Sequence, residues 1–240
     1  MNKNLLQLYK KALDMRDPWL NRWDSARRYT MPTTDDEIAT LYDATASDAV
    51  DNLAASMYTL LTPPESGWLN LVRESDLSPD AEIATKTLRA HLNDSNFYTT
   101  IHQCYLDLVI LGTACLFMSE NPIGSNSAFS FTAIPVSDIA ILGGAIFHTT
   151  SMTAAEVMEK YPKWTPPANL RSSIKSNPQI QLKLVQSLIG KEFTAWLDVG
   201  GDIENNIVSN GVFETNPYIV FRWRSEEHTS ELQSRSDLVC

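Results

Sequence analysis

The spacing of apolar residues changes at Pro122, and this change restricts the fold more than any other feature of the chain. Before Pro122, apolar residues recur every three or four positions, which is the period of helices with one buried face. After it they form short runs rich in β-branched and aromatic residues, separated by glycine pairs and prolines, which is typical of strands and turns. The order predicts an α+β fold, with a mainly helical part at 1–121 and a β-rich part at 122–223.

Proline and glycine divide the first part into five predicted helices. Asp17-Pro18 predicts a new start after the first helix, because aspartate is a frequent N-cap and proline suits the first helical position. Thr62-Pro63-Pro64 stops the third helix and Gly112 ends the last one. The predicted helices cover 4–16, 18–31, 42–61, 79–92 and 97–111.

The third of these helices, 42–61, is rich in alanine, which allows a neighbouring helix to approach closely. Its apolar residues recur at intervals of three and four. We expect Ala49, Leu53 and Met57 to lie on its buried face and Asp43 to be its N-cap.

The second part reads as a series of strands with glycine turns at Gly143-Gly144 and Gly200-Gly201. One helix, 153–161, interrupts it and is followed by a loop that contains Pro162, Pro166 and Pro167. The predicted strands of the whole chain are 67–72 (anchored by Trp68), 113–119, 129–134, 139–148, 181–188, 193–199, 203–208 and 218–223.

Residues 224–240 do not continue this pattern. Their first eleven residues resemble the translation of a common sequencing-library adapter, and no apolar residue appears before Leu232. We expect this segment to be an artefact that packs against nothing, with the natural protein continuing after Trp223. Without it, two of the 19 basic and four of the 29 acidic residues are lost, which leaves 17 against 25, or a net charge of −8.

The charge balance of the whole chain is acidic, at −10. This argues against a protein that grips nucleic acid through a basic face, because phosphate contacts dominate that affinity. The most basic stretch holds Arg16, Arg22, Arg27 and Arg28, and a solvated helix face is favoured there over a contact with DNA or a partner. The most apolar run, 108–118, is too short to cross a bilayer.

Histidine and cysteine do not form a convincing metal site. Cys104, Cys115 and Cys240 are too few and too irregular for a disulfide framework. His91 and His102 could join the first two cysteines around zinc, but His102 and Cys104 lie two apart on a predicted helix and face different directions. We therefore expect Cys104 to act as a small core residue.

Three carboxylates, Asp43, Asp48 and Asp51, are of the type that a metal-dependent nuclease uses. Only Asp48 and Asp51 have a spacing that makes them neighbours on a helix. No phosphate-binding loop and no nucleophile elbow is present. The sequence therefore predicts no catalytic residue, no cofactor, no metal site and no enzyme.

An ordered set of short motifs resembles the head-to-tail connector (portal) proteins of short-tailed bacteriophages. The resemblance covers about residues 5–223, and the order of the motifs makes it specific. Its residues are Tyr42, Asp43, Thr45, Ala46, Leu53, Ala54, Ala55, Pro63, Pro64, Trp68, Asn96, Phe97, Gly112, Thr113, Ala114, Pro135, Arg222 and Trp223.

The resemblance implies a structural subunit of a ring, usually of twelve copies, at one capsid vertex. Viral DNA passes through such a ring during packaging and ejection, without sequence-specific contact. The implied partners are further copies of the chain, the terminase, capsid or scaffold proteins and tail adaptors, and no membrane. The implied fold is a portal wing that is incomplete here. The implied location is the virion, assembled in the host bacterial cytoplasm.

Two alternatives remain open on the sequence. The first is a different phage structural protein, such as a head-completion or tail-adaptor protein. The second is a metal-dependent nuclease that uses Asp43, Asp48 and Asp51. The phage host, the symmetry number and the residues that line a tunnel or bind terminase and tail are not encoded in any recognisable motif.

Overall fold

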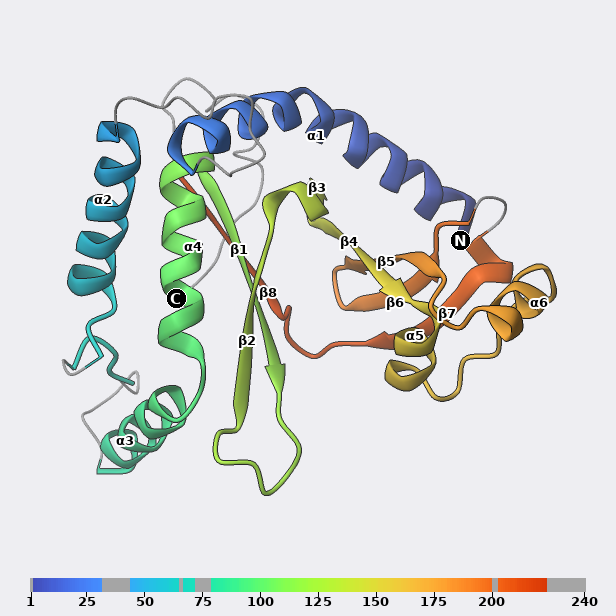
Figure 1. Cartoon of the computed structure of the whole chain (residues 1–240). Coiled ribbons are helices and arrows are strands. Elements are labelled where there is room, and N and C mark those ends of the chain that lie inside the picture. The colour runs from blue at the N-terminus through green and yellow to red at the C-terminus, as the bar shows by residue number, and fades with distance from the viewer. Residues whose placement is uncertain (1, 32–43, 65–66, 72–78, 200–202, 224–240) are drawn as a thin grey trace. The chain divides into compact units, whose positions relative to one another are not determined.

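The computed structural model describes residues 2–31, 44–64, 67–71, 79–199 and 203–223 (Figure 1). These ranges hold helices followed by a β-rich half, so the predicted α+β class is confirmed. The helices are α1 (Asn2–Thr30), α2 (Thr45–Leu61), α3 (Pro79–Asn93), α4 (Phe97–Leu111), α5 (Ala154–Lys160) and α6 (Ala168–Ser176). The strands are β1 (Thr113–Glu120), β2 (Phe129–Ile134), β3 (Ile139–Leu142), β4 (Ala145–Thr153), β5 (Gln181–Ile189), β6 (Glu192–Leu197), β7 (Ile207–Val212) and β8 (Tyr218–Arg222). Short 3-10 helices cover Val136–Asp138 and Ile203–Asn206.

The chain folds into two compact units, each made of two separate pieces of sequence. The five-stranded unit consists of Met1–Leu20 and Ser137–Asn216. The described residues of the three-stranded unit lie within 21–136 and 217–223. The chain therefore passes between the units three times.

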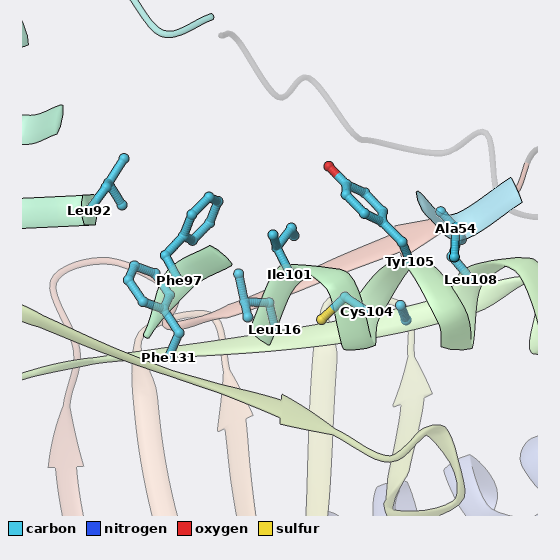
Figure 2. Packing of buried hydrophobic residues seen from close by; sticks show 10 residues of the cluster. Ala54, Leu92, Phe97, Ile101, Cys104, Tyr105, Leu108, Leu116 and Phe131 are labelled. Carbon is cyan, nitrogen blue, oxygen red and sulfur yellow. The ribbon is translucent and has the colours of Figure 1, made fainter. Parts of the chain in front are cut away.

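The three-stranded unit has β1 at the centre of an antiparallel sheet, between β2 and β8. Helix α4 packs on this sheet, and its apolar residues at spacings of four and three are all buried: Phe97, Ile101, Cys104, Leu108 and Leu111. Figure 2 shows the first four of these side chains in one cluster with Leu116 of β1 and Phe131 of β2. The spacing of four and three residues thus identified the buried side of this helix correctly.

Gly112 ends α4 in the left-handed conformation, with φ of 72°. Residues with a Cβ rarely adopt this conformation, which explains glycine at this position. The chain reverses there and enters β1 directly, so the predicted helix end and the predicted strand after it are both confirmed.

The predicted buried face of α2 is wrong. Val50 and Ala54 are the buried residues of this helix, whereas Ala49 is exposed, Leu53 is 46% exposed and Met57 is only partly buried. Two apolar stripes run side by side along α2, and periodicity alone does not say which one its neighbour covers. The covered stripe contains Ala54, which has no exposed surface (Figure 2). The small side chain of Ala54 allows α4 to approach closely.

The predicted N-cap of α2 is also wrong. The helix begins at Thr45, with Ala44 at the N-cap position and no side chain bonded to its first turn. Asp43 and Tyr42 lie outside the described residues, as do Ser78, Gly200-Gly201 and the segment 224–240.

Helix α1 is one continuous helix rather than the two that Asp17-Pro18 predicted. Proline lacks the N–H that would bond to the carbonyl of Asp14, so Pro18 is a weak point in the hydrogen-bond ladder. Packing holds the helix on both sides of this point: Tyr9 and Ala12 are buried in the five-stranded unit, and Arg27 pairs with a carboxylate of the three-stranded unit. Tertiary contacts therefore override the local stop signal.

The five-stranded unit is an antiparallel sheet in the order β3-β4-β5-β6-β7. Successive residues of a strand point to opposite faces, so Leu184 and Val185 of β5 mark its two sides. Val185 packs with Tyr9 of α1 and Trp196, while Leu184 packs with residues of α5 and α6, such as Val157. Both faces of the sheet are thus covered by helices of the same unit.

Three further elements differ from the sequence prediction. Residues 67–71 form no strand, although Trp68 is anchored as expected by stacking on Phe97. The predicted strand 203–208 begins as a 3-10 helix and becomes β7 only at Ile207. Helix α6 was missed, because only two of its nine residues, Leu170 and Ile174, have large apolar side chains.

Adjacent alanines of α2 test the corrected face. We expect Ala54→Leu to lower the free energy of unfolding by about 1–3 kcal/mol, because the larger side chain has no room against α4. Ala55→Leu on the exposed side should change it by less than about 0.5 kcal/mol. Urea denaturation of the two variants measures the difference. Equal losses of stability would contradict the assignment of Ala54 to the buried face of α2.

We expect His148 of β4 to make the stability of the five-stranded unit depend on pH. Burial lowers the pKa of His148; Asp138 and a bond to Gln186 act in the opposite direction, and Lys160 adds to the lowering. Its Nε2 lies 3.1 Å from Oγ1 of Thr150.

Because the folded state binds this proton less readily than the unfolded state, the free energy of unfolding falls as pH drops through and below the ordinary histidine range. We expect the urea midpoint to fall between about pH 8 and pH 5 more steeply in the unchanged chain than in His148→Gln. His102→Gln removes a histidine from the other unit and serves as the control. An identical pH profile for the unchanged chain and His148→Gln would contradict the assignment.

Candidate functional site

Some of the motif residues that the structure describes meet in the core of the three-stranded unit. Ala54 of α2, Phe97 of α4 and Ala114 of β1 belong to one buried cluster. They come from segments far apart in the sequence, and each has 8% of its surface exposed or less. These three motif residues therefore contribute to packing.

The end of α2 is fixed by a hydrogen bond that periodicity did not predict. The hydroxyl of Tyr105 on α4 donates to Oγ1 of Thr62 at 3.3 Å, and both residues are buried. Burial raises the pKa of Tyr105, so the phenol stays protonated and able to donate. Pro63 and Pro64 follow directly, and the helix cannot continue past this bond.

The segment 67–71 is clamped by Arg89 of α3. The Arg89 Nε donates to the carbonyl of Leu69 at 2.9 Å, and its Nη2 donates to Oδ1 of Asn70 at 2.7 Å. A Cβ at Gly67 would come within 2.9 Å of Nη2 of this guanidinium, so a larger residue there would displace the end of the Arg89 side chain. Trp68 then stacks on Phe97, with ring centroids 6.0 Å apart.

Asn96 joins the start of α4 to strand β2 through both ends of its side-chain amide. Nδ2 donates to the carbonyl of Phe131 at 2.7 Å, and Oδ1 accepts from the N–H of Phe131 at 2.8 Å. Phe131 in turn packs on Phe97, with ring centroids 5.1 Å apart. The amide of asparagine offers a donor and an acceptor on two separate atoms, which lets it bond to both backbone groups of one residue.

Arg222 and Trp223 close the described part of the chain beside Gly112. Trp223 donates its backbone N–H to the carbonyl of Gly112 at 3.0 Å, and Arg222 pairs with Thr113 across β1 and β8. Both side chains are exposed, as are those of Thr45, Ala46, Leu53, Ala55 and Pro135. The motif set thus divides into buried residues that build the core and exposed residues whose role the fold alone does not explain.

The basic stretch of α1 is anchored to the body of the chain. Arg16 Nη1 donates to the carbonyl of Ser137 at 2.7 Å, and Arg27 Nη2 lies 3.2 Å from Oδ1 of Asp107. Burial raises the pKa of Asp107 and the Arg27 guanidinium opposes this. Arg28 pairs with Asp24 on the same helix. Arg16 and Arg27 are therefore not purely solvated, because each bonds to another part of the protein.

The histidines and cysteines considered for zinc have separate structural roles. His91 accepts the N–H of Ala128 on Nδ1, and His102 packs edge-on against Tyr58. Cys104 and Cys115 are buried free thiols, and burial raises the pKa of each to about 12. Within the described residues, no group of three or more histidine, cysteine or acidic side chains is placed to share a metal ion.

Asp48 and Asp51 are both exposed on α2, and Asp43 lies outside the described residues. In the ranges that the structure describes, no helix is long and apolar enough to cross a membrane.

A family model for the bacteriophage head to tail connecting protein matches residues 2–230, which is nearly the whole chain. The chain belongs to this family. No curated protein gives a match. The resemblance drawn from the ordered motifs is therefore confirmed.

A head-to-tail connecting protein is a structural component of the phage virion. In this connecting protein, the sequence motifs include Ala54, Phe97 and Gly112, around which the three-stranded unit is built. Sequence reasoning missed the Arg89 clamp and the bond between Tyr105 and Thr62. An arginine within a helix and an isolated tyrosine carry no signal of what they bind.

The clamp made by Asn96 can be tested directly. We expect Asn96→Ala to lower the free energy of unfolding of the connecting protein by about 1–3 kcal/mol, because it leaves the backbone groups of Phe131 without their partner. Asn93→Ala, at the exposed end of α3, is the matched control and should change it by less than about 0.5 kcal/mol. Denaturant unfolding followed by tryptophan fluorescence measures both, and an equal effect of the two changes would exclude the clamp.

Proposed function

We propose that this connecting protein is the portal subunit of a short-tailed phage. Further copies form a ring with it, usually of twelve, at one capsid vertex. Viral DNA enters the capsid through the ring during packaging and leaves through it during ejection. The observation that carries the proposal is the family match over residues 2–230 together with the ordered motifs that build one core.

The charge of the chain supports a passive role toward DNA. A net charge of −10 disfavours the phosphate contacts that hold a duplex tightly. Arg16 and Arg27, two arginines of its most basic stretch, hydrogen-bond to other parts of the protein. A tunnel through which DNA moves in both directions benefits from weak, sequence-independent contact.

Exposed apolar side chains support the association of this chain with other protein chains. Leu53 and Leu60 lie two turns apart on one side of α2 and are 46% and 80% exposed. Large exposed apolar groups that share a face favour coverage by a partner. A ring of identical subunits requires such heterologous contacts, in which two different surfaces of one chain meet.

The implied partners follow from the same proposal. A portal ring is the docking point of the terminase during packaging and of tail adaptors afterwards, and capsid or scaffold proteins surround it. Assembly would take place in the cytoplasm of the bacterial host. The protein performs no bond-breaking reaction in this scheme, and no cofactor is needed.

The proposed ring is tested by comparing the oligomeric state of the full natural gene product with that of the 240-residue chain. The product of the natural gene, read through its own stop codon, should give one large discrete species in size-exclusion chromatography with light scattering, and rings in negative-stain electron microscopy. The 240-residue chain should give monomers and heterogeneous aggregates, because we expect parts of the ring interface to be absent from it.

A monodisperse monomer from the natural gene, over a range of concentrations and salt, would count against the portal role. It would favour the head-completion or tail-adaptor alternative, in which the protein joins a ring made by another chain. Adding the monomer to purified portal rings of the same phage would then give a discrete complex.

A further inference from the structure

Strand β8 is the last strand of the three-stranded sheet, and its outer side presents backbone groups that the ladder with β1 does not use. Hydrogen bonds to β1 are made at both ends of β8, by the N–H of Trp223 and by the carbonyl of Pro217. Bonded residues alternate along an antiparallel ladder, so Val220 and Arg222 direct their N–H and carbonyl groups away from β1. In the ranges that the structure describes, no strand pairs with this side of β8.

The structure describes β8 completely, and this strand has neither a bulge nor an internal proline to obstruct pairing. Its register with β1 is continuous from Tyr218 to Arg222. Its sequence is Tyr-Ile-Val-Phe-Arg, in which aromatic and β-branched residues favour an extended strand. Ile219, opposite Leu116 on the side of the sheet that faces α4, is 42% exposed. An edge of this kind is a template for an added strand.

The charge at the end of this edge indicates which kind of strand fits. Arg222 is the only charged residue of β8, and its side chain is exposed. The ion pairs among the described residues all involve other side chains. An arginine in this position disfavours a basic strand and favours one with a carboxylate at the opposite position.

Pairing of β8 with β8 of a second copy matches this charge less well. The antiparallel arrangement centred on Val220 would place Arg222 opposite Tyr218 of the second copy. A tyrosine offers the guanidinium no opposite charge. Charge complementarity therefore favours a different segment, which is acidic where β8 is basic.

We propose that the outer edge of β8 binds an extended segment of another protein, which adds a fourth strand to the sheet and places a carboxylate opposite Arg222. Val220 and Arg222 each exchange a pair of backbone hydrogen bonds with this segment. The carboxylate pairs with the guanidinium, and apolar side chains of the segment cover Ile219. The inference concerns one edge of one sheet and does not depend on the ring.

An acidic peptide tests this edge. The probe is Glu-Val-Thr-Val-Thr, blocked at both ends, whose antiparallel pairing brings its glutamate opposite Arg222 and its central threonine opposite Val220. Amide hydrogen exchange of the monomeric 240-residue chain is followed by NMR with and without the probe. We expect exchange at Val220 and Arg222 to slow as the probe is added. Exchange at Ile219 and Phe221, which bond to β1, should be slow throughout.

Charge reversal tests the ion pair. Arg222→Glu should weaken binding of the acidic probe by about fivefold or more and should bind the peptide Lys-Val-Thr-Val-Thr better than the unchanged chain does. Lys191→Glu makes the same change of charge at an exposed turn of the other unit, and should leave both affinities unchanged. A methyl group on the central threonine nitrogen of the probe should abolish binding, because this nitrogen donates to the carbonyl of Val220.

Unchanged exchange at Val220 and Arg222 at millimolar concentrations of the probe would overturn the proposal. Equal binding of the acidic and basic peptides to the unchanged chain would also overturn it, because the charge would then select nothing. Protection of Val220 in the chain alone, together with a dimer in light scattering, would assign the edge to a second copy instead. If Arg222→Glu does not fold, the two peptides and the methylated probe on the unchanged chain decide the question.

Discussion

The tight reversal at Gly112 is the constraint on which the three-stranded unit depends. It places α4 back along β1, so that Cys104 of the helix lies against the backbone of Cys115. The other elements of the unit pack on α4 or pair with β1. Helix α2 packs on α4 through Ala54, and β2 and β8 extend β1 on either side. A residue with a Cβ at position 112 would strain the turn that all of these contacts share.

The elements that sequence reasoning found correctly are those in which local pattern and tertiary packing agree. In helix α4 the apolar residues at spacings of four and three are the buried ones, and a glycine ends the helix where the pattern ends. The hairpin of β3 and β4 likewise has its glycine pair at the turn and its apolar runs on both sides.

The elements that sequence reasoning predicted wrongly are those in which the local signal is ambiguous or is overridden by tertiary packing. Helix α2 presents two apolar stripes, and only the position of α4 selects the one with Val50 and Ala54. Helix α1 passes a strong stop signal at Pro18 because contacts on both sides of it hold the helix. The motif residues could be named from the sequence. Contacts such as that of Arg89 with Leu69 could not, because they join two segments that no local pattern predicts to be neighbours.

The clamp made by Asn96 has a consequence for the outer side of the sheet. Strand β2 is an edge strand, and Phe131 directs its N–H and carbonyl away from β1, because the neighbouring residues Ser130 and Thr132 take the ladder positions opposite Ser119 and Phe117. Asn96 occupies both of these groups with a side chain that imitates the backbone of an added strand. An extended segment from another molecule cannot pair in register there, so the residue that fixes α4 also protects the sheet against edge-to-edge aggregation.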